Sequence, residues 1–362
     1  MQNPEQSTQS LTWPMVIRNV PGSILRLRGT FTPPIGTPNG IAELRPVLLN
    51  GHPQWLLIRG ADKSNPLLLY VPGGPGESNI WAAHYTMREV ERHFVCVNWD
   101  PRGASKSLHP APDPATMTID QFVKDTIALI EVLLQRFDRK KLLLIGHSWG
   151  SFLAMKVAAA RPELLYAVIG MGQEVDNRRG EEISYRYAVE RARAAGDRSA
   201  LRTLQQLGGS DTYTKSGKFV ERMLLFRLGG LMHTGGIRAV LAIMLSAPEF
   251  SIAECVRYAR NEGTAFSIPL MADELMKLNL LTEVKELEVP VFLFEGKYDY
   301  TAPYELAEEF FAALKAPHKR LVWFEESGHP MDVEEPEKFQ REVIAIGAEC
   351  CCDAPRVSAA RG

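Results

Sequence analysis

The sequence predicts an α/β fold, in which a mostly parallel central sheet is flanked by helices on both faces. Short apolar runs alternate with helical stretches along much of the chain, which is typical of parallel strands joined by crossover helices. One of those runs, residues 66–71, is continuously apolar after its initial proline, as expected of a strand buried on both faces. The alternation is lost between about residues 173 and 287, which indicates a helical insertion into this fold.

Six strands are predicted before the insertion. Residues 41–60 form the first two, around the turn signal Asn50-Gly51. The other four lie at 66–71, 93–99, 141–145 and 164–171, and helices are predicted at about 80–92, 118–137 and 151–160. Thr118 is a candidate N-cap of the long middle helix, because its hydroxyl can accept from an amide group of the first turn.

The alternation resumes after the insertion. It predicts a strand at 290–296, a helix at 304–315, a strand at 320–325 and a last helix from about 334. We therefore expect a core made of residues 41–172 and 288–362. Residues 173–287 form a helical cap inserted after the sixth core strand, and residues 1–40 form an N-terminal arm.

Composition and charge narrow the function. The chain has 362 residues, with 41 Lys and Arg against 43 Asp and Glu, and no basic block, which argues against nucleic-acid binding. No apolar stretch approaches the roughly 18 residues of a transmembrane helix. The five cysteines lack CxxC spacing, so we expect no disulfide framework and a cytoplasmic location. Cys96 is expected in the core, and the triplet 350–352 on the solvent side of the last helix. No oligomeric state follows from these features.

The turn after the strand at 141–145 reads Gly146-His147-Ser148-Trp149-Gly150, a G-x-S-x-G. It joins a buried strand to a helix, which is the context of a nucleophile elbow. The glycines leave room for the tight turn, and the free amide groups at the helix N-terminus point at the reacting centre. Ser148 is therefore the predicted nucleophile.

A serine hydroxyl needs a general base, and that base needs an acid to orient it. On such a sheet the expected chain order is Ser, then Asp or Glu, then His. Asp299 follows the strand at 290–296, and His329 follows the strand at 320–325, so both lie at the carboxyl ends of strands. We predict a Ser148–His329–Asp299 triad. The rival acids are Glu295, Glu174 and Asp176.

The glycine-rich stretch VPGGPG, residues 71–76, follows another buried strand. No lysine follows in the pattern of a phosphate-binding loop, and Pro75 removes one amide donor. An oxyanion hole needs only two donors: the amide after the nucleophile and one from the loop after an earlier strand. Trp149 supplies the first, and this loop is placed to supply the second.

Three signatures together resemble the α/β-hydrolase superfamily, and within it the proline iminopeptidase-like branch. They are GGPG at 73–76, the D-x-R-G-x-S-x-S segment at 100–107 and GHSWGS at 146–151. The resemblance implies that Gly74 is the second oxyanion donor. It also implies that the insertion roofs the site, and that Asp100 and Arg102 brace the neighbouring loop without reacting.

The chain also departs from that branch. Pro72 precedes the two glycines where the branch usually has His, and Glu77-Ser78-Asn79 stands where more glycine is usual. No tryptophan occurs between residues 150 and 322, although the branch often holds the substrate amine with acidic residues on Trp-rich cap helices. Glu174, which opens the cap, is the leading candidate for that contact.

The expected activity is that of a serine hydrolase that cleaves an ester or amide of a small molecule or short peptide through an acyl-enzyme. It would use no cofactor and no metal. An aminopeptidase, a carboxylic-ester hydrolase or lactonase, and an acyltransferase on a hydrophobic acyl compound are alternatives. A non-catalytic ligand-binding sensor that retains the fold is a further alternative.

Overall fold

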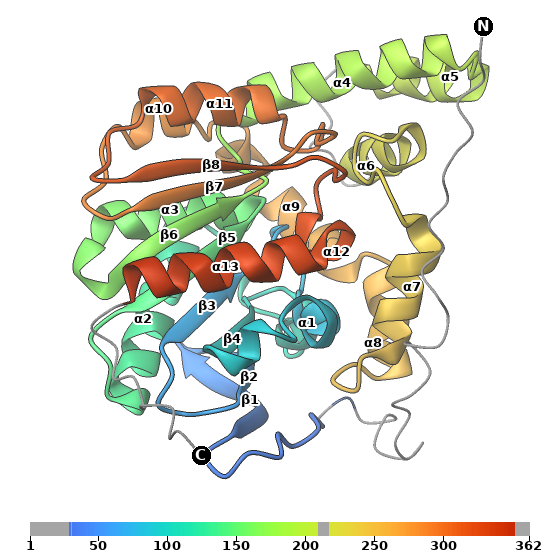
Figure 1. Ribbon diagram of the computed structural model, residues 1–362. Helices are drawn as coiled ribbons and strands as arrows, with labels where there is room; N and C mark the ends of the chain where they lie inside the picture. The colour runs from blue at the N-terminus through green and yellow to red at the C-terminus, as the bar shows by residue number, and fades with distance from the viewer. Residues whose placement is uncertain (1–28, 30, 209–216, 352–362) are drawn as a thin grey trace, which may run out of the picture.

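The computed structural model describes residues 29, 31–208 and 217–351. Its eight-stranded sheet has the order β1-β2-β4-β3-β5-β6-β7-β8 (Figure 1). The strands are β1 (Ile41–Leu49), β2 (His52–Gly60), β3 (Leu67–Val71), β4 (Val95–Asp100), β5 (Leu142–His147), β6 (Leu165–Met171), β7 (Val291–Gly296) and β8 (Lys319–Phe324). The pairs β1–β2 and β2–β4 are antiparallel, and every other pair is parallel. This confirms the predicted mostly parallel sheet.

Strand β3 shows how the sheet divides the core. Leu67 and Leu69 point into the hydrophobic cluster on one face, while Leu68 and Tyr70 point into the cluster on the other. This alternation follows from the two-residue repeat of a strand, and it explains why the whole run is apolar. Truncating Leu69 to alanine would remove fully buried carbon and cost about 2–5 kcal/mol of stability.

Helices cover both faces of the sheet. The first face packs against α2 (Ile119–Phe137), α3 (Trp149–Ala160) and α11 (Tyr304–Ala313). The second packs against α13 (Pro336–Cys350), which crosses the sheet in Figure 1. The shorter helices α1 (Ile80–Thr86) and α12 (Met331–Glu334) lie near the end of α13.

Helix α2 begins where the sequence predicts. The Thr118 hydroxyl accepts a hydrogen bond from the Gln121 amide at 3.2 Å, which satisfies one of the free N–H groups of the first turn. The helix ends at Phe137 and is followed by Asp138, whose φ of 52° lies in the left-handed region that stops helices.

Between β6 and β7 the described residues form helices and no strand of the sheet. These helices are α4 (Asn177–Ala194), α5 (Arg198–Leu207), α6 (Gly217–Leu228), α7 (Gly236–Ser246), α8 (Ile252–Ala259), α9 (Glu262–Leu275) and α10 (Leu280–Glu283). Asp176 and Asn279 form an isolated antiparallel bridge, and the Asn279 amide donates to the Asp176 carboxylate at 2.8 Å. The helical segment therefore leaves and rejoins the core at neighbouring points.

Most of the predicted N-terminal arm lies outside the described residues. Within it, the Gly29 carbonyl accepts a hydrogen bond from Lys106 Nζ at 2.5 Å. Cys96 is buried in β4, as predicted. The C-terminal cysteines were predicted to face the solvent. This is wrong for Cys351, which is buried in the hydrophobic cluster that also contains the buried side chains of α13. Cys350 is half-buried. Cys352 lies outside the described residues.

None of the helices in the described ranges combines the length and the apolar character needed to cross a membrane.

Candidate active site

Ser148 occupies a strained turn between β5 and α3. Its φ of 53° and ψ of −125° are rarely adopted by a residue with a side chain and cost on the order of 1–3 kcal/mol. The flanking glycines make the turn sterically feasible. A Cβ atom on Gly146 would lie 2.1 Å from the Gly150 carbonyl oxygen, and one on Gly150 would lie 2.3 Å from the Val71 carbonyl oxygen. Helix α3 begins immediately after Ser148, so its free N-terminal amides surround this residue.

Asp299 and His329 are brought together from the loops after β7 and β8. His329 Nδ1 lies 2.7 Å from Asp299 Oδ2, and the Asp299 side chain is completely buried. The other carboxylate oxygen of Asp299 accepts from the amides of Thr301 and Ala302, at 2.8 and 3.0 Å. These three contacts fix the carboxylate, and an acceptor beside Nδ1 favours the imidazole tautomer that carries its proton on that nitrogen.

Ser148 and His329 line one cavity of about 180 Å³. Gly74, Trp149 and Glu174 line it too, so every predicted site residue except the buried Asp299 reaches this space. The other lining residues are Glu77, Asn177, Lys218, Arg222, Leu231, Asn261, Thr264, Ile268, Leu275 and Thr301.

The glycine-rich loop after β3 lies against Ser148. A Cβ atom added to Gly73 would be 3.2 Å from the Cβ of Ser148. Gly74 has a φ of 119°, and a side chain there would meet the Gly76 amide nitrogen at 2.4 Å. The backbone can therefore approach the site this closely only because both positions lack side chains.

The rival acids occupy other positions. Glu295 lies within β7 and accepts from the Gln173 amide at 3.1 Å, and burial together with the nearby Asp299 charge raises its pKa well above the ordinary value. Asp176 caps α4 by accepting from the Arg179 amide at 3.1 Å. Of the predicted acids, Asp299 is the one that contacts the histidine.

The cavity is also lined by charged groups from α6. Lys218 pairs with Glu181 and with Glu221, the latter at 3.2 Å. Burial raises the pKa of Glu174, and the charges of Arg222 and Lys218 oppose that effect. These two cations are not predicted from the sequence, because helical periodicity does not tell which neighbour a polar side chain faces.

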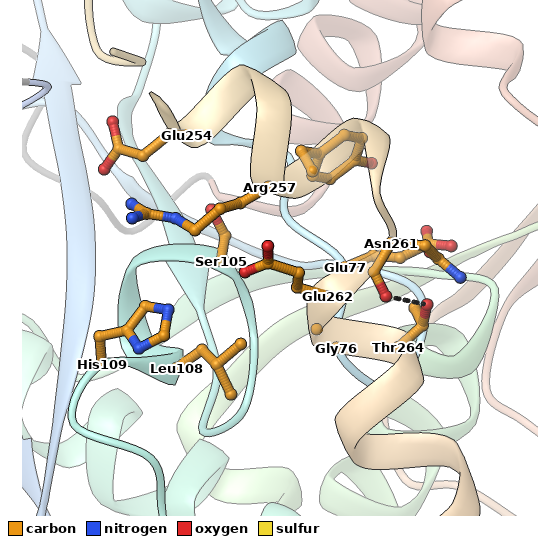
Figure 2. Close-up of a pocket in the computed structure, with 12 residues that line it drawn as sticks. Gly76, Glu77, Ser105, Leu108, His109, Glu254, Arg257, Asn261, Glu262 and Thr264 are labelled. Carbon is orange, nitrogen blue, oxygen red and sulfur yellow. Dashed lines mark hydrogen bonds between the residues drawn. The ribbon is translucent and has the colours of Figure 1, made fainter. Parts of the chain in front are cut away.

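Asn261 and Thr264, which are likewise not predicted from the sequence, line the cavity from the start of α9. Both residues, together with Glu77, also line a second cavity of about 160 Å³ (Figure 2). The two cavities therefore adjoin each other at these three residues.

Asp100 and Arg102 lie behind the site in a buried network. Arg102 Nε donates to Asp125 at 2.6 Å, and its Nη1 donates to Thr116 at 2.6 Å. Asp100 accepts from the Lys106 amide at 3.1 Å. Neither Asp100 nor Arg102 lines the cavity that contains Ser148.

Comparison with known proteins accords with the fold. The family described as alpha/beta hydrolase fold matches residues 66–336. The chain belongs to the α/β-hydrolase family. A curated relative in Bacillus subtilis (strain 168), named probable aminopeptidase YbaC, is 34% identical over 302 residues, which is 83% of this chain and 94% of the relative. This match supports the resemblance to the proline iminopeptidase-like branch.

Two more distant proteins are also similar. A putative carbamate hydrolase RutD of Pseudomonas savastanoi pv. phaseolicola is 22% identical, covering 77% of this chain and 92% of the relative. The crystal structure of proline iminopeptidase from Mycobacterium smegmatis superposes with a TM-score of 0.62 at 17% identity, covering 86% of this chain and all of that one. The structural likeness supports the fold.

Among the described residues, no three His, Cys, Asp or Glu side chains converge in a way that could hold a metal ion.

Proposed function

We propose that this α/β-hydrolase is a serine hydrolase that works through an acyl-enzyme. Ser148 attacks the substrate carbonyl while His329 Nε2 takes its proton, and the imidazolium then donates that proton to the leaving group. Water, deprotonated by the same histidine, releases the acyl group. The main support is the 2.7 Å contact between His329 and Asp299, beside a cavity that His329 shares with Ser148.

The tetrahedral oxyanion would be bound by the amides of Gly74 and Trp149. Both residues line the cavity, and the Trp149 amide belongs to the free N-terminal turn of α3. Removing one such donor typically costs about 3 kcal/mol of transition-state stabilisation. Asp299 would not react, but would orient the imidazole and stabilise its charged form.

The charge of the cavity favours a substrate with an ammonium group. Four carboxylates lie in or beside it, against the two cations on α6; the carboxylates are Glu77, Glu174, Glu181 and Glu221. Carboxyl groups therefore outnumber cationic side chains here, and a bound ammonium group would stabilise their ionised form. Together with the aminopeptidase name of the 34% identical relative, this supports an aminopeptidase acting on short peptides or small amides. Glu174 and Glu77, which both line the cavity, are the two carboxylates that could bind the amine, and the substrate pair described below decides between them.

A carboxylic-ester hydrolase is the second candidate. Part of the cavity wall is apolar, formed by Leu231, Ile268 and Leu275, and would accept a hydrophobic acyl chain. Such a substrate would make no use of the carboxylates.

Two substrates decide between these candidates. Wild-type protein and Ser148→Ala would be assayed on an alanyl arylamide and on a short-chain aryl ester. We expect the arylamide to be cleaved, and the substitution to lower kcat by about 10⁶-fold. If the wild type cleaves only the ester and Ser148→Ala cleaves neither substrate, the protein is an esterase instead. Activity that survives in purified Ser148→Ala protein would contradict the mechanism on either substrate.

A further inference from the structure

Glu77 directly follows the glycine-rich loop and lies beside the nucleophile. The point where a Cβ of Gly73 would lie is 3.0 Å from Glu77 Oε2 and 3.2 Å from Ser148 Cβ. The carboxylate oxygen and the serine Cβ are therefore no farther apart than the sum of these two contacts. Glu77 also lines the cavity that contains Ser148.

Within the described residues, no hydrogen bond or ion pair reaches the Glu77 carboxylate. The other acidic groups of the cavity differ in this respect. Glu181 and Glu221 are bound to Lys218, and the charge of Glu174 is opposed by Arg222 and Lys218. Glu77 is half-buried. A half-buried anion without a cation partner is poorly compensated, so a bound cation would be stabilised beside it.

The distance suits an α-aminoacyl substrate. In such a substrate the ammonium nitrogen is two bonds from the carbonyl carbon that the serine attacks. Once that carbon is within reach of the Ser148 hydroxyl, the ammonium group must lie within a few ångströms of the serine side chain. Glu77 occupies this range on the side of the glycine-rich loop.

We propose that Glu77 binds the α-ammonium group of the substrate, and that specificity for a free amine is set mainly by this residue. The inference rests on the proposed aminopeptidase function. Because Glu77, Asn261 and Thr264 line both cavities, the ammonium would be held where the two cavities meet. Figure 2 shows these three residues in the second cavity. Arg257 lines the second cavity but makes no ion pair with Glu77 within the described residues.

A pair of substrates that differ only in the amine tests this proposal. These are the alanyl and propionyl amides of 7-amino-4-methylcoumarin, assayed with wild type, Glu77→Gln and Glu174→Gln. We expect Glu77→Gln to lower the ratio of kcat/KM for alanyl over propionyl amide about 30-fold, since it loses a charge-assisted hydrogen bond. Glu174→Gln should lower that ratio by less than about threefold, because α6 cations already oppose its charge.

The two substrates should respond in opposite directions. Removing a negative charge close to the developing oxyanion should raise the rate on the propionyl amide while the rate on the alanyl amide falls. A purely structural role would lower both rates together, and that result would overturn the proposal. Thermal unfolding of each variant checks that it is folded. Glu77→Asp keeps the negative charge and should recover part of the ratio.

The remaining outcomes separate the two hypotheses. If Glu174→Gln collapses the ratio and Glu77→Gln leaves it unchanged, the assignment to Glu77 is wrong and the aminopeptidase function stands. If wild-type protein prefers the propionyl amide, the aminopeptidase function itself is wrong, and the inference falls with it.

Discussion

The ring of His147 lies against the ring of His329, with centroids 4.7 Å apart, and His147 Nε2 is 3.2 Å from the His329 carbonyl oxygen. Burial, and next the charge of His329, hold the pKa of His147 well below its ordinary value. His147 therefore stays neutral when His329 accepts a proton, and two adjacent cations are avoided. His147, the residue before Ser148, is thus a neutral hydrogen-bonding neighbour of His329.

His147→Phe should keep the packed ring but lose the hydrogen bond to the His329 backbone. We expect kcat/KM to fall by about 2–10-fold, the usual worth of one neutral hydrogen bond. The acid limb of the pH dependence of kcat/KM should stay where it lies in the wild type between pH 5 and 8, because burial holds the pKa of His147 well below its ordinary value. Rate measurements across that range check this. An acid limb at a different pH in the variant would show that it arises from ionisation of His147 in the wild-type protein.

Asp299→Asn should leave the loop in place and disable the base. The asparagine oxygen can still accept from the amides of Thr301 and Ala302, so the unfolding free energy should change little. The side chain no longer holds the proton on His329 Nδ1, and kcat should fall by about 10⁴-fold. Steady-state kinetics with a urea unfolding curve measure both quantities. A variant that keeps more than a tenth of the activity would show that another acid orients His329.

The sequence predicted the strands closely, because each is a continuous apolar run bounded by turn residues. The predicted strand at 290–296 is β7 at Val291–Gly296, and the insertion follows β6 as expected. The strand order and the antiparallel pairing of β2 with β4 depend on contacts distant in sequence, which local patterns do not reveal. In the sequence, Glu77 stands out only as a departure from a family pattern. The structure shows that it lies beside Ser148.

Gly150→Ala should prevent the tight approach of α3 to β3. The new Cβ would lie 2.3 Å from the Val71 carbonyl oxygen and 2.5 Å from that of Pro72, which are backbone atoms that cannot rotate away. We expect a loss of at least about 1–3 kcal/mol in unfolding free energy, and loss of activity. Gly36→Ala is the matched control, since nothing lies within 4 Å of its added Cβ. Equal urea midpoints for the two variants would contradict this reading.

Asp100 makes the stability of the protein depend on pH. It is completely buried, and burial raises its pKa to about 7, although the Ser78 hydroxyl and the Lys106 charge oppose this effect. In the unfolded chain an aspartate has a pKa of about 3.9. Between these two values the folded state holds a proton that the unfolded state has released. The contribution of Asp100 to stability is therefore complete at low pH, falls as pH rises from about 4 to about 7, and is constant above that.

Asp100→Asn should remove this dependence, because an amide does not ionise. Between about pH 4 and 7 the free energy of unfolding of the variant should fall less steeply than that of wild type, by up to about 1.4 kcal/mol per pH unit. Urea unfolding at four pH values across this range measures the difference. Glu91 and Asp332, whose pKa values burial also raises, remain in both proteins, so the difference between the two curves isolates Asp100. Parallel curves would mean that Asp100 ionises alike in the folded and unfolded chains.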